Sequence, residues 1–259
     1  MCVQERQIQE SNTRHEAPEG AVAVELVGAS KSYGDVHALR ELDLSARLGR
    51  CLVLLGPNGA GKTTALGLIT GILRPSAGVC RVFGLECFRD RAKIMERLAY
   101  APAEPHFPDS TTAHEVTRFA SRMRGIEPDT AKARIDRLAR KLELESAMDR
   151  DPSTFSKGMS KKLALLLALL ARPRFLVLDE PFNGLDPRAR RTLTATLREL
   201  RDDGVGILLC THDFTVAEAL ADDIIIVDGG RARARGTLEE LGGADRQSLE
   251  SAYFATTEA

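Results

Sequence analysis

The sequence of 259 residues contains no tryptophan, few aromatic residues and almost no net charge. Aromatic residues make up 5% of the chain, and 36 Lys and Arg stand against 37 Asp and Glu, for a net charge of -1. With almost no net charge, the chain as a whole is not attracted to nucleic acid or to an anionic bilayer. Such a partner would have to bind a local basic patch. The composition is otherwise that of an ordinary globular protein, which excludes disorder as the dominant state.

Long apolar runs are also missing. The longest, residues 163–171, is far shorter than the roughly 20 residues that cross a bilayer, so the sequence predicts no membrane span. Residues 1–20 are mostly polar and lack the apolar core of a signal peptide, and we expect them to form a flexible leader.

Cysteine is scarce and unpatterned. The five cysteines are odd in number, lie far apart in the sequence and include no pair with metal-ligand or redox spacing. This favours reduced thiols in a cytosol. The residues concerned are Cys2, Cys51, Cys80, Cys87 and Cys210.

Apolar patterning predicts an α/β fold. Residues 22–26 and 39–44 alternate as in an antiparallel β layer, whereas residues 51–55 form a continuous apolar run typical of a strand buried on both faces. Such strands alternating with helix-like stretches predict a mainly parallel sheet that is covered on both faces. The other buried strands are expected at residues 175–178, 206–210 and 224–227, with helices after residue 187 and at residues 214–220.

The middle third interrupts this alternation. Thr112 to Glu115 has the form of a capping box and precedes a helix with Val116, Phe119, Ala120 and Met123 on one face. A second helix is expected to begin at Pro128. Two successive helices without a strand between them indicate an inserted helical subdomain at about residues 109–152.

Residues 56–63, GPNGAGKT, match the phosphate-binding loop pattern at every fixed position, between a predicted strand and a predicted helix. Glycines let the backbone curl so that its N–H groups point at phosphate oxygens, and the helix adds its positive end. The plainer alternative is a turn that only joins strand to helix. We favour nucleotide binding, with Lys62 on the β- and γ-phosphates and Thr63 on Mg²⁺. The expected nucleotide contacts are Gly56, Pro57, Asn58, Gly59, Ala60, Gly61, Lys62, Thr63 and Thr64.

Two acids follow the apolar strand at residues 175–178. Asp179 is placed to hold Mg²⁺, and Glu180 is suited to act as general base for the attacking water. His212 follows another buried strand and is expected at the same edge of the sheet, near the γ-phosphate or the water. A plain strand end and a structural histidine are the alternatives, which the nearby phosphate loop makes less attractive.

Together these segments resemble the ATP-binding cassette (ABC) ATPases. The separating feature is Phe155-Ser-Lys-Gly-Met159, which is similar to the signature loop of that family and precedes the helix leading to Asp179. Tyr33 matches the aromatic residue that stacks on adenine, and residues 183–187 match a loop that crosses between two subunits, with Asp186 in it. The resemblance implies a P-loop NTPase core with a mainly parallel sheet, an N-terminal antiparallel β layer and an inserted helical subdomain, over residues 21–236. A C-terminal helical tail is expected at residues 237–259.

In this family, ATP lies between the phosphate loop of one nucleotide-binding domain and the signature loop of another. The resemblance therefore implies a second cassette, identical or different, whose site receives Ser156 and the backbone at Gly158. Because the chain has no predicted span, it also implies a separate transmembrane permease that docks near the helical insertion and Phe107, on the cytoplasmic face of the membrane. Signature loops reading Ser-Lys-Gly-Met are similar to those of bacterial efflux systems, which favours export.

The chain departs from the family at Lys157 and Met159, where glycine and glutamine are commonest, and at Ala103, where the family has glutamine or glutamate. We expect Glu104 not to replace that side chain, because neighbours in an extended segment point to opposite sides. Two other functions stay open: a soluble ABC-type ATPase acting on nucleic acid or ribosomes, and a regulatory cassette. No nucleic acid is expected, because the alternating arginines at residues 231–235 suit a solvated strand face.

Overall fold

The computed structural model describes residues 20–242 and 249–257. Residues 1–19 of the expected leader lie outside the described residues, as do Cys2 and residues 243–248 and 258–259 of the expected tail. In the described ranges, no helix is both long enough and apolar enough to cross a membrane.

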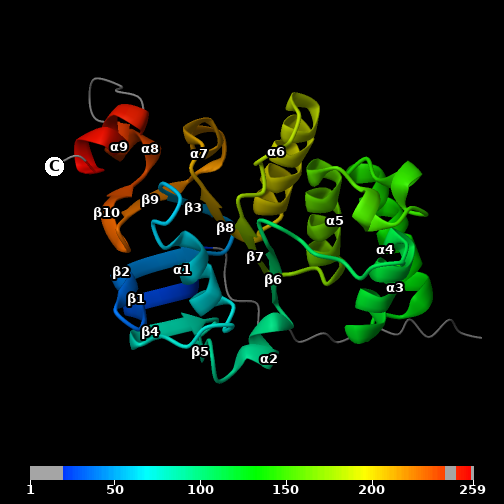
Figure 1. The fold of residues 1–259 in the computed structure, drawn as a ribbon, viewed down its shortest axis with the longest axis horizontal. Helices are drawn as coiled ribbons and strands as arrows, with labels where there is room; N and C mark the ends of the chain where they lie inside the picture. The colour runs from blue at the N-terminus through cyan, green and yellow to red at the C-terminus, as the bar shows by residue number, and fades with distance from the viewer. Residues whose placement is uncertain (1–19, 243–248, 258–259) are drawn as a thin grey trace, which may run out of the picture.

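The chain forms two sheets, which lie one against the other (Figure 1). The first is antiparallel, in the order β2-β1-β4-β5, with β1 (Val22–Tyr33), β2 (Val36–Arg47), β4 (Ala77–Val82) and β5 (Leu85–Glu86). The second has six strands in the order β10-β9-β3-β8-β7-β6, with β3 (Cys51–Leu55), β6 (Leu98–Ala101), β7 (Phe175–Asp179), β8 (Gly206–Thr211), β9 (Asp223–Asp228) and β10 (Arg231–Gly236). All its neighbours pair in parallel except β10 with β9. The predicted fold class is therefore confirmed.

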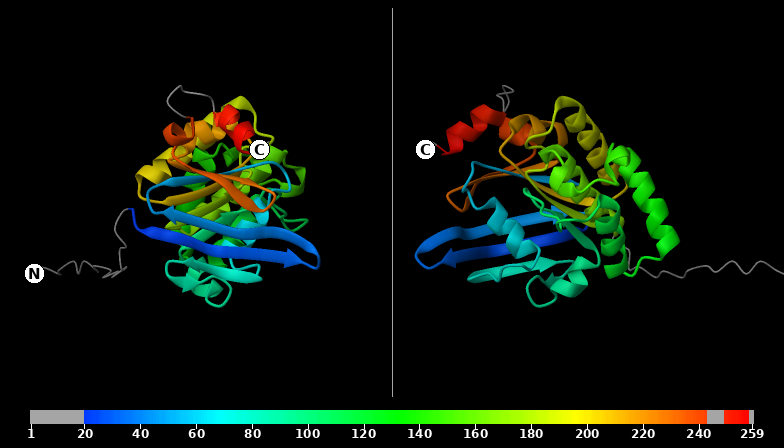
Figure 2. Two further views of the ribbon diagram at one scale, coloured as in Figure 1. Left: turned by 90° about the vertical axis from the view of Figure 1, so that its left-hand side faces the viewer. Right: turned by 45° about the vertical axis from the view of Figure 1, so that its right-hand side comes forward.

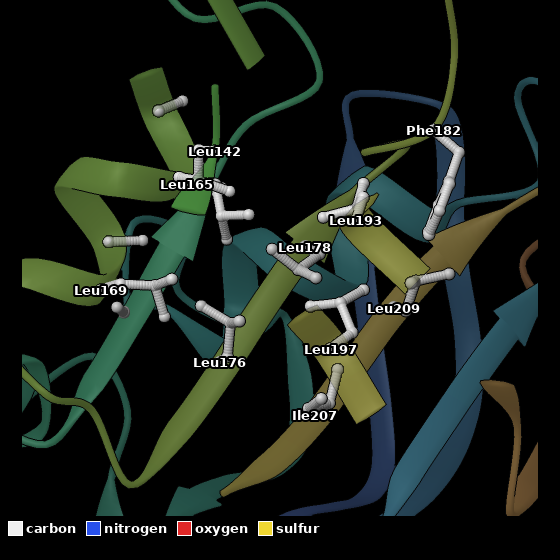
Figure 3. Packing of buried hydrophobic residues seen from close by; sticks show 14 of the residues in the cluster. Leu142, Leu165, Leu169, Leu176, Leu178, Phe182, Leu193, Leu197, Ile207 and Leu209 are labelled. Atoms are coloured by element: carbon white, nitrogen blue, oxygen red, sulfur yellow. The ribbon is translucent and has the colours of Figure 1, made fainter. Parts of the chain in front are cut away.

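Both faces of the six-stranded sheet are covered, which explains why β3, β7 and β8 are apolar without alternation. One face packs against the antiparallel sheet and helix α1 (Lys62–Ile69). The other face packs against α5 (Lys157–Leu170), α6 (Pro187–Asp202) and α7 (Phe214–Leu220). Figure 3 shows Leu165 and Leu169 of α5, and Leu193 and Leu197 of α6, converging on leucines of β7 and β8.

Helices α3 (Ala113–Met123) and α4 (Pro128–Lys141) follow one another without a strand between them, at the end of the molecule opposite α8 (Leu238–Gly242) and α9 (Leu249–Thr257), as Figures 1 and 2 show. Two short 3₁₀ turns, Glu145–Ala147 and Pro152–Thr154, connect α4 to α5. A five-residue helix, α2 (Arg91–Met95), precedes β6.

The capping box of α3 is present: Thr112 Oγ1 accepts from the Glu115 N–H, and Glu115 accepts from the Thr112 N–H. Of the apolar face expected from the sequence, however, Phe119 and Met123 point outward, 65% and 73% exposed, and Val116 and Ala120 are only half-buried. The buried face carries small residues, because small side chains let α3 approach its neighbours closely. Its hydroxyls are satisfied within the helix, Thr117 Oγ1 by the His114 carbonyl at 2.9 Å and Ser121 Oγ by the Thr117 carbonyl at 2.8 Å.

The sequence analysis missed β4, β5 and β6, and with them the approach of two cysteines that are separated in the sequence. Cys80 of β4 and Cys87, just after β5, are both buried and bring their Sγ atoms to 2.7 Å across the hairpin. The hydrogen bond between them, together with burial, raises the pKa of Cys80. Both are free thiols. That the protein works in a reducing cytosol stays a prediction.

Candidate active site

The glycine-rich loop joins β3 to α1 and is held against the backbone of two other elements. A Cβ on Gly56 would lie 2.1 Å from the Val227 carbonyl oxygen of β9, and a Cβ on Gly61 would lie 2.5 Å from the Ala38 carbonyl oxygen of β2. Gly61 also has φ 100°, a conformation that favours glycine. These close approaches explain why the loop needs glycine at both positions.

Lys62, the first residue of α1, points back into this loop and is only 6% exposed. Its Nζ donates to the carbonyl oxygens of Gly56 at 2.7 Å and Pro57 at 3.0 Å. The same atom lies 3.4 Å from Oε1 of Glu180. A buried ammonium needs such partners. The loop thus holds the Lys62 cation at the N-terminus of α1, and both the cation and the helix end favour the binding of an anion.

Asp179, the last residue of β7, contacts Thr63, which follows Lys62 in α1. Its Oδ2 accepts a hydrogen bond of 2.9 Å from Thr63 Oγ1, whereas Oδ1 is buried without a partner. Burial raises the pKa of the Asp179 carboxyl, and the bond from Thr63 acts in the opposite direction. A hydroxyl beside a carboxylate with an unused oxygen is a donor set that suits a hard divalent cation.

Glu180 follows directly and has φ 45°, which is uncommon for a residue other than glycine. Its N–H donates to the Cys210 carbonyl of β8 at 3.0 Å. Its Oε1 lies 3.0 Å from Nδ1 of His212, which follows β8. The structure therefore places Lys62 and His212 on a single oxygen of the Glu180 carboxylate.

Lys62, Asp179 and Glu180 line a cleft of about 740 Å³. His212 does not line this cleft but a neighbouring hollow beside Pro57 and Asn58, although it contacts Glu180. Ala103 and Glu104, in the bend after β6, both line the cleft. Because β6 ends at Ala101, strand alternation does not extend to these two residues. The expectation that Glu104 does not replace the family's side chain at position 103 stays a prediction. The predicted contact residues that line the cleft are Pro57, Asn58, Gly59, Gly61, Lys62, Thr63, Thr64, Asp179 and Glu180.

The sequence pattern of the ABC transporter family matches residues 39–183. This chain belongs to the ABC transporter family. It is the ATP-binding subunit of such a transporter, an ATPase whose hydrolysis of ATP is coupled to transport.

Two relatives show how far the similarity extends. The chain is 35% identical over 219 residues to daunorubicin resistance ATP-binding protein DrrA3 of Streptomyces coeruleorubidus, which covers 85% of this chain and 69% of the relative. It is 34% identical over 233 residues to Nod factor export ATP-binding protein I of Ralstonia nicotianae. That alignment covers 88% of this chain and 73% of the relative.

Solved structures agree with the fold. An ATP-binding subunit of an ABC transporter, 31% identical, superposes with a TM-score of 0.84 over 91% of this chain and 99% of that one. The dimeric ATP-binding cassette MJ0796 with ADP and Pi, 22% identical, superposes with a TM-score of 0.77 over 83% and 99%.

Several residues predicted for the site of this ABC ATPase lie outside the cleft. Tyr33 is 48% exposed at the end of β1, with the Lys31 ammonium 5.1 Å from its ring centroid. Gly56 and Ala60 are buried in the loop itself. Asp186 caps α6 by accepting from the N–H groups of Arg188 and Ala189. These bonds lower the pKa of Asp186.

The signature loop of this cassette begins α5. Ser156 is its N-cap, and Ser156 Oγ accepts from the Met159 N–H at 3.2 Å. A Cβ on Gly158 would lie 3.2 Å from Leu185, so the signature loop packs on the loop at residues 183–187 of the same chain. Neither Ser156 nor Gly158 lines the cleft that holds Lys62.

Sequence reasoning missed several residues that line this cleft, among them His106, Ser160 and Lys161. Lys161 donates from Nζ to the carbonyl oxygen of Glu180. The signal that could have drawn attention to Lys161 is its place in the second turn of the helix that the signature loop begins.

Proposed function

We propose that this ATPase subunit binds ATP with Mg²⁺ in the described cleft, closes on a second cassette to hydrolyse it, and powers export through a separate permease. The observation that carries the proposal is the Asp179 carboxylate. One of its oxygens is held by Thr63, the other is buried without a partner, and the Lys62–Glu180–His212 cluster lies alongside.

Thr63 and Asp179 are the residues that would hold Mg²⁺. In the described ranges, no group of three or more His, Cys, Asp and Glu side chains is arranged to bind a metal. Mg²⁺ keeps several waters and is usually held by one or two protein groups and substrate phosphates, which matches this sparse donor set. When bound, it neutralises charge on the phosphate oxygens.

The loop supplies the remaining charge for the phosphates. Lys62 exchanges its bonds to the Gly56 and Pro57 carbonyls for phosphate oxygens. Backbone N–H groups of a glycine-rich loop and of the helix N-terminus that follows it add to the binding of the same anion. Tyr33 is at the end of a strand, where its exposed ring is available to stack on adenine.

Glu180 acts as the general base. Its carboxylate accepts the proton of the attacking water, and the bond from His212 Nδ1 keeps the carboxylate aimed into the site.

A second cassette completes the site. Ser156 and Gly158 do not line the cleft of their own chain, so their hydroxyl and backbone N–H are available to the phosphate bound by a partner. The dimeric form of the cassette MJ0796 supports this arrangement, in either a homodimer or a heterodimer.

The helical insertion offers the surface for the permease. Phe119 and Met123 are exposed on α3, and half-buried Phe107 precedes it. Relatives named for Nod factor export and daunorubicin resistance support export. We place the subunit on the cytoplasmic face of the membrane. A nucleic-acid partner is not favoured, because Arg231 and Arg233 of β10 pair with Glu41 and Asp228.

The metal site is tested by titrating the protein with a fluorescent ATP analogue, with Mg²⁺ and with EDTA. Wild type should bind more tightly with Mg²⁺. Asp179→Asn should lose that increment, because the amide lacks the negative charge, while its affinity in EDTA stays near that of wild type. Asp203→Asn, which changes an exposed carboxylate at the end of α6, is the matched control. Equal affinity of wild type in both conditions would overturn the metal site.

A further inference from the structure

Lys161 is a cation that the proposed mechanism has not used. It lies on α5, in the second turn after the Ser156 N-cap, and lines the nucleotide cleft. Its Nζ donates to the backbone carbonyl oxygen of Glu180. A single helix therefore presents the signature loop at its N-terminus and contacts the candidate base of its own site one turn later.

The contacted peptide is an unusual one. Glu180 has φ 45°, in the left-handed region that side chains other than glycine rarely adopt, so the surrounding structure must hold it there. Its N–H is held by the Cys210 carbonyl of β8, and its C=O is held by Lys161. These two bonds, one on each side of the Cα atom, orient the side chain toward His212 and Lys62.

The charges around Lys161 explain how an ammonium is kept at this place. Burial lowers its pKa, and the carboxylates of Glu180, Asp179 and Glu104 act in the opposite direction. An uncompensated ammonium would be costly to bury. The acidic edge of the sheet therefore stabilises the cation that restrains the Glu180 backbone.

We infer that Lys161 is a positioning residue for ATP hydrolysis, which holds the Glu180 peptide so that its carboxylate is aimed at the attacking water. The inference rests on the proposed role of Glu180. Lys161 acts through that residue and not on the nucleotide, so its loss affects the chemical step and leaves ATP binding nearly unchanged.

The test is steady-state ATPase kinetics of the full chain, as purified or with its permease, for Lys161→Met, Lys161→Arg and Lys162→Met. Lys161→Met keeps the stem without the donor, and kcat should fall about 10- to 100-fold, because small misplacements of a catalytic group have effects of that size. KM should change less than about threefold. Lys161→Arg keeps a charged donor and should recover most of kcat.

Lys162→Met is the matched control. Lys162 is the next residue on α5, but its Nζ pairs with Glu143, 3.3 Å away, and does not line the cleft. Its kcat should stay within about twofold of wild type. Thermal unfolding of each variant checks folding. If Lys161→Met does not fold, Lys161→Gln, which has a shorter polar end, takes its place and should lower kcat at least severalfold.

A second comparison separates positioning from a general structural role. In a Glu180→Gln background, Lys161→Met should cause little further loss of kcat, since residues that act through one group are not additive. An equal loss in both backgrounds would overturn the inference, as would unchanged kcat or a change confined to KM. If wild type itself neither binds nor hydrolyses Mg-ATP, the proposed function fails instead.

Discussion

Nδ1 of His212 lies 3.0 Å from Oε1 of Glu180, although 32 residues separate them in the sequence. The contact arises because β7 and β8 are parallel neighbours, so that the residues following both strands meet at one edge of the sheet. The same carboxylate oxygen lies 3.4 Å from Nζ of Lys62. The candidate base is thus oriented between a histidine and the lysine of the phosphate loop.

Glu180→Gln should leave ATP binding intact and slow hydrolysis by roughly 100-fold or more, because the amide keeps the shape of the carboxylate without its basicity. Single-turnover hydrolysis and nucleotide titration measure the two effects separately. A variant that hydrolyses ATP at the wild-type rate would remove Glu180 from the role of base.

The same variant should accumulate ATP between two cassettes and so run as a dimer in size-exclusion chromatography with Mg-ATP. If it remains a monomer, the run is repeated after co-expression with the membrane partner. A monomeric cassette together with a permease that carries only one copy would contradict the two-cassette site.

Lys62→Ala should weaken ATP binding about 10- to 100-fold, since charge-assisted hydrogen bonds contribute about 1.5 to 3 kcal/mol. Titration with a fluorescent nucleotide measures the loss. Because Lys62 also bonds to the Gly56 and Pro57 carbonyls, circular dichroism should first establish that the variant is folded. Unchanged affinity in a folded variant would exclude the phosphate-loop assignment.

Ala103→Gln should change the stimulation of ATPase activity by the permease while shifting the ATP dissociation constant less than about tenfold, or under ~1.4 kcal/mol. In the proposed site, Thr63, Asp179 and Lys62 supply the groups for Mg-ATP. The methyl group of Ala103, which cannot accept a hydrogen bond, should therefore cost the protein a link to the permease and not a nucleotide contact. Both quantities are measured on reconstituted complex. A large change in affinity with unaltered stimulation would assign this position to nucleotide binding instead.

Glu143→Gln should destabilise the protein at neutral pH by about 1 kcal/mol or less, the range of partly exposed ion pairs. Glu143 lies 2.8 Å from Arg188 of α6 and 3.3 Å from Lys162 of α5, and bonds from Arg188 and then Lys162 lower its pKa from the ordinary 4.5. Because the pKa of Glu143 is lower in the folded than in the unfolded protein, its ion pairs stabilise the fold fully above about pH 4.5. That stabilisation is lost as the pH falls through the pKa of the folded state.

The measurement is chemical unfolding of wild type and Glu143→Gln across the acidic range. The difference between the two proteins should shrink to nothing once the carboxyl is protonated in both the folded and the unfolded state. A difference that persists unchanged at the acid end would show that Glu143 stabilises the fold by packing and not by charge.

The sequence predicted correctly those features that depend only on residues close to one another in the chain. The buried strand at residues 51–55, the glycine-rich loop after it and the helix that begins at Lys62 follow from an apolar run, from the conformations open to glycine and from helix capping. The acids at Asp179 and Glu180 were placed correctly at a strand end for the same reason. Strand β4 escaped notice because it lacks a continuous apolar run, and β5 and β6 because they have only two and four residues.

Contacts between distant elements were decided by tertiary structure. The helical pattern of α3 shows an apolar face, but close packing buried the small face and left Phe119 and Met123 outside. The Cys80–Cys87 pair depends on the register of a hairpin, and the Lys161–Glu180 bond depends on how α5 lies across the end of β7. Sequence patterning indicates where a single helix or strand forms and ends, whereas packing between elements decides which face is buried, and sheet order and packing set the distances from which the site is built.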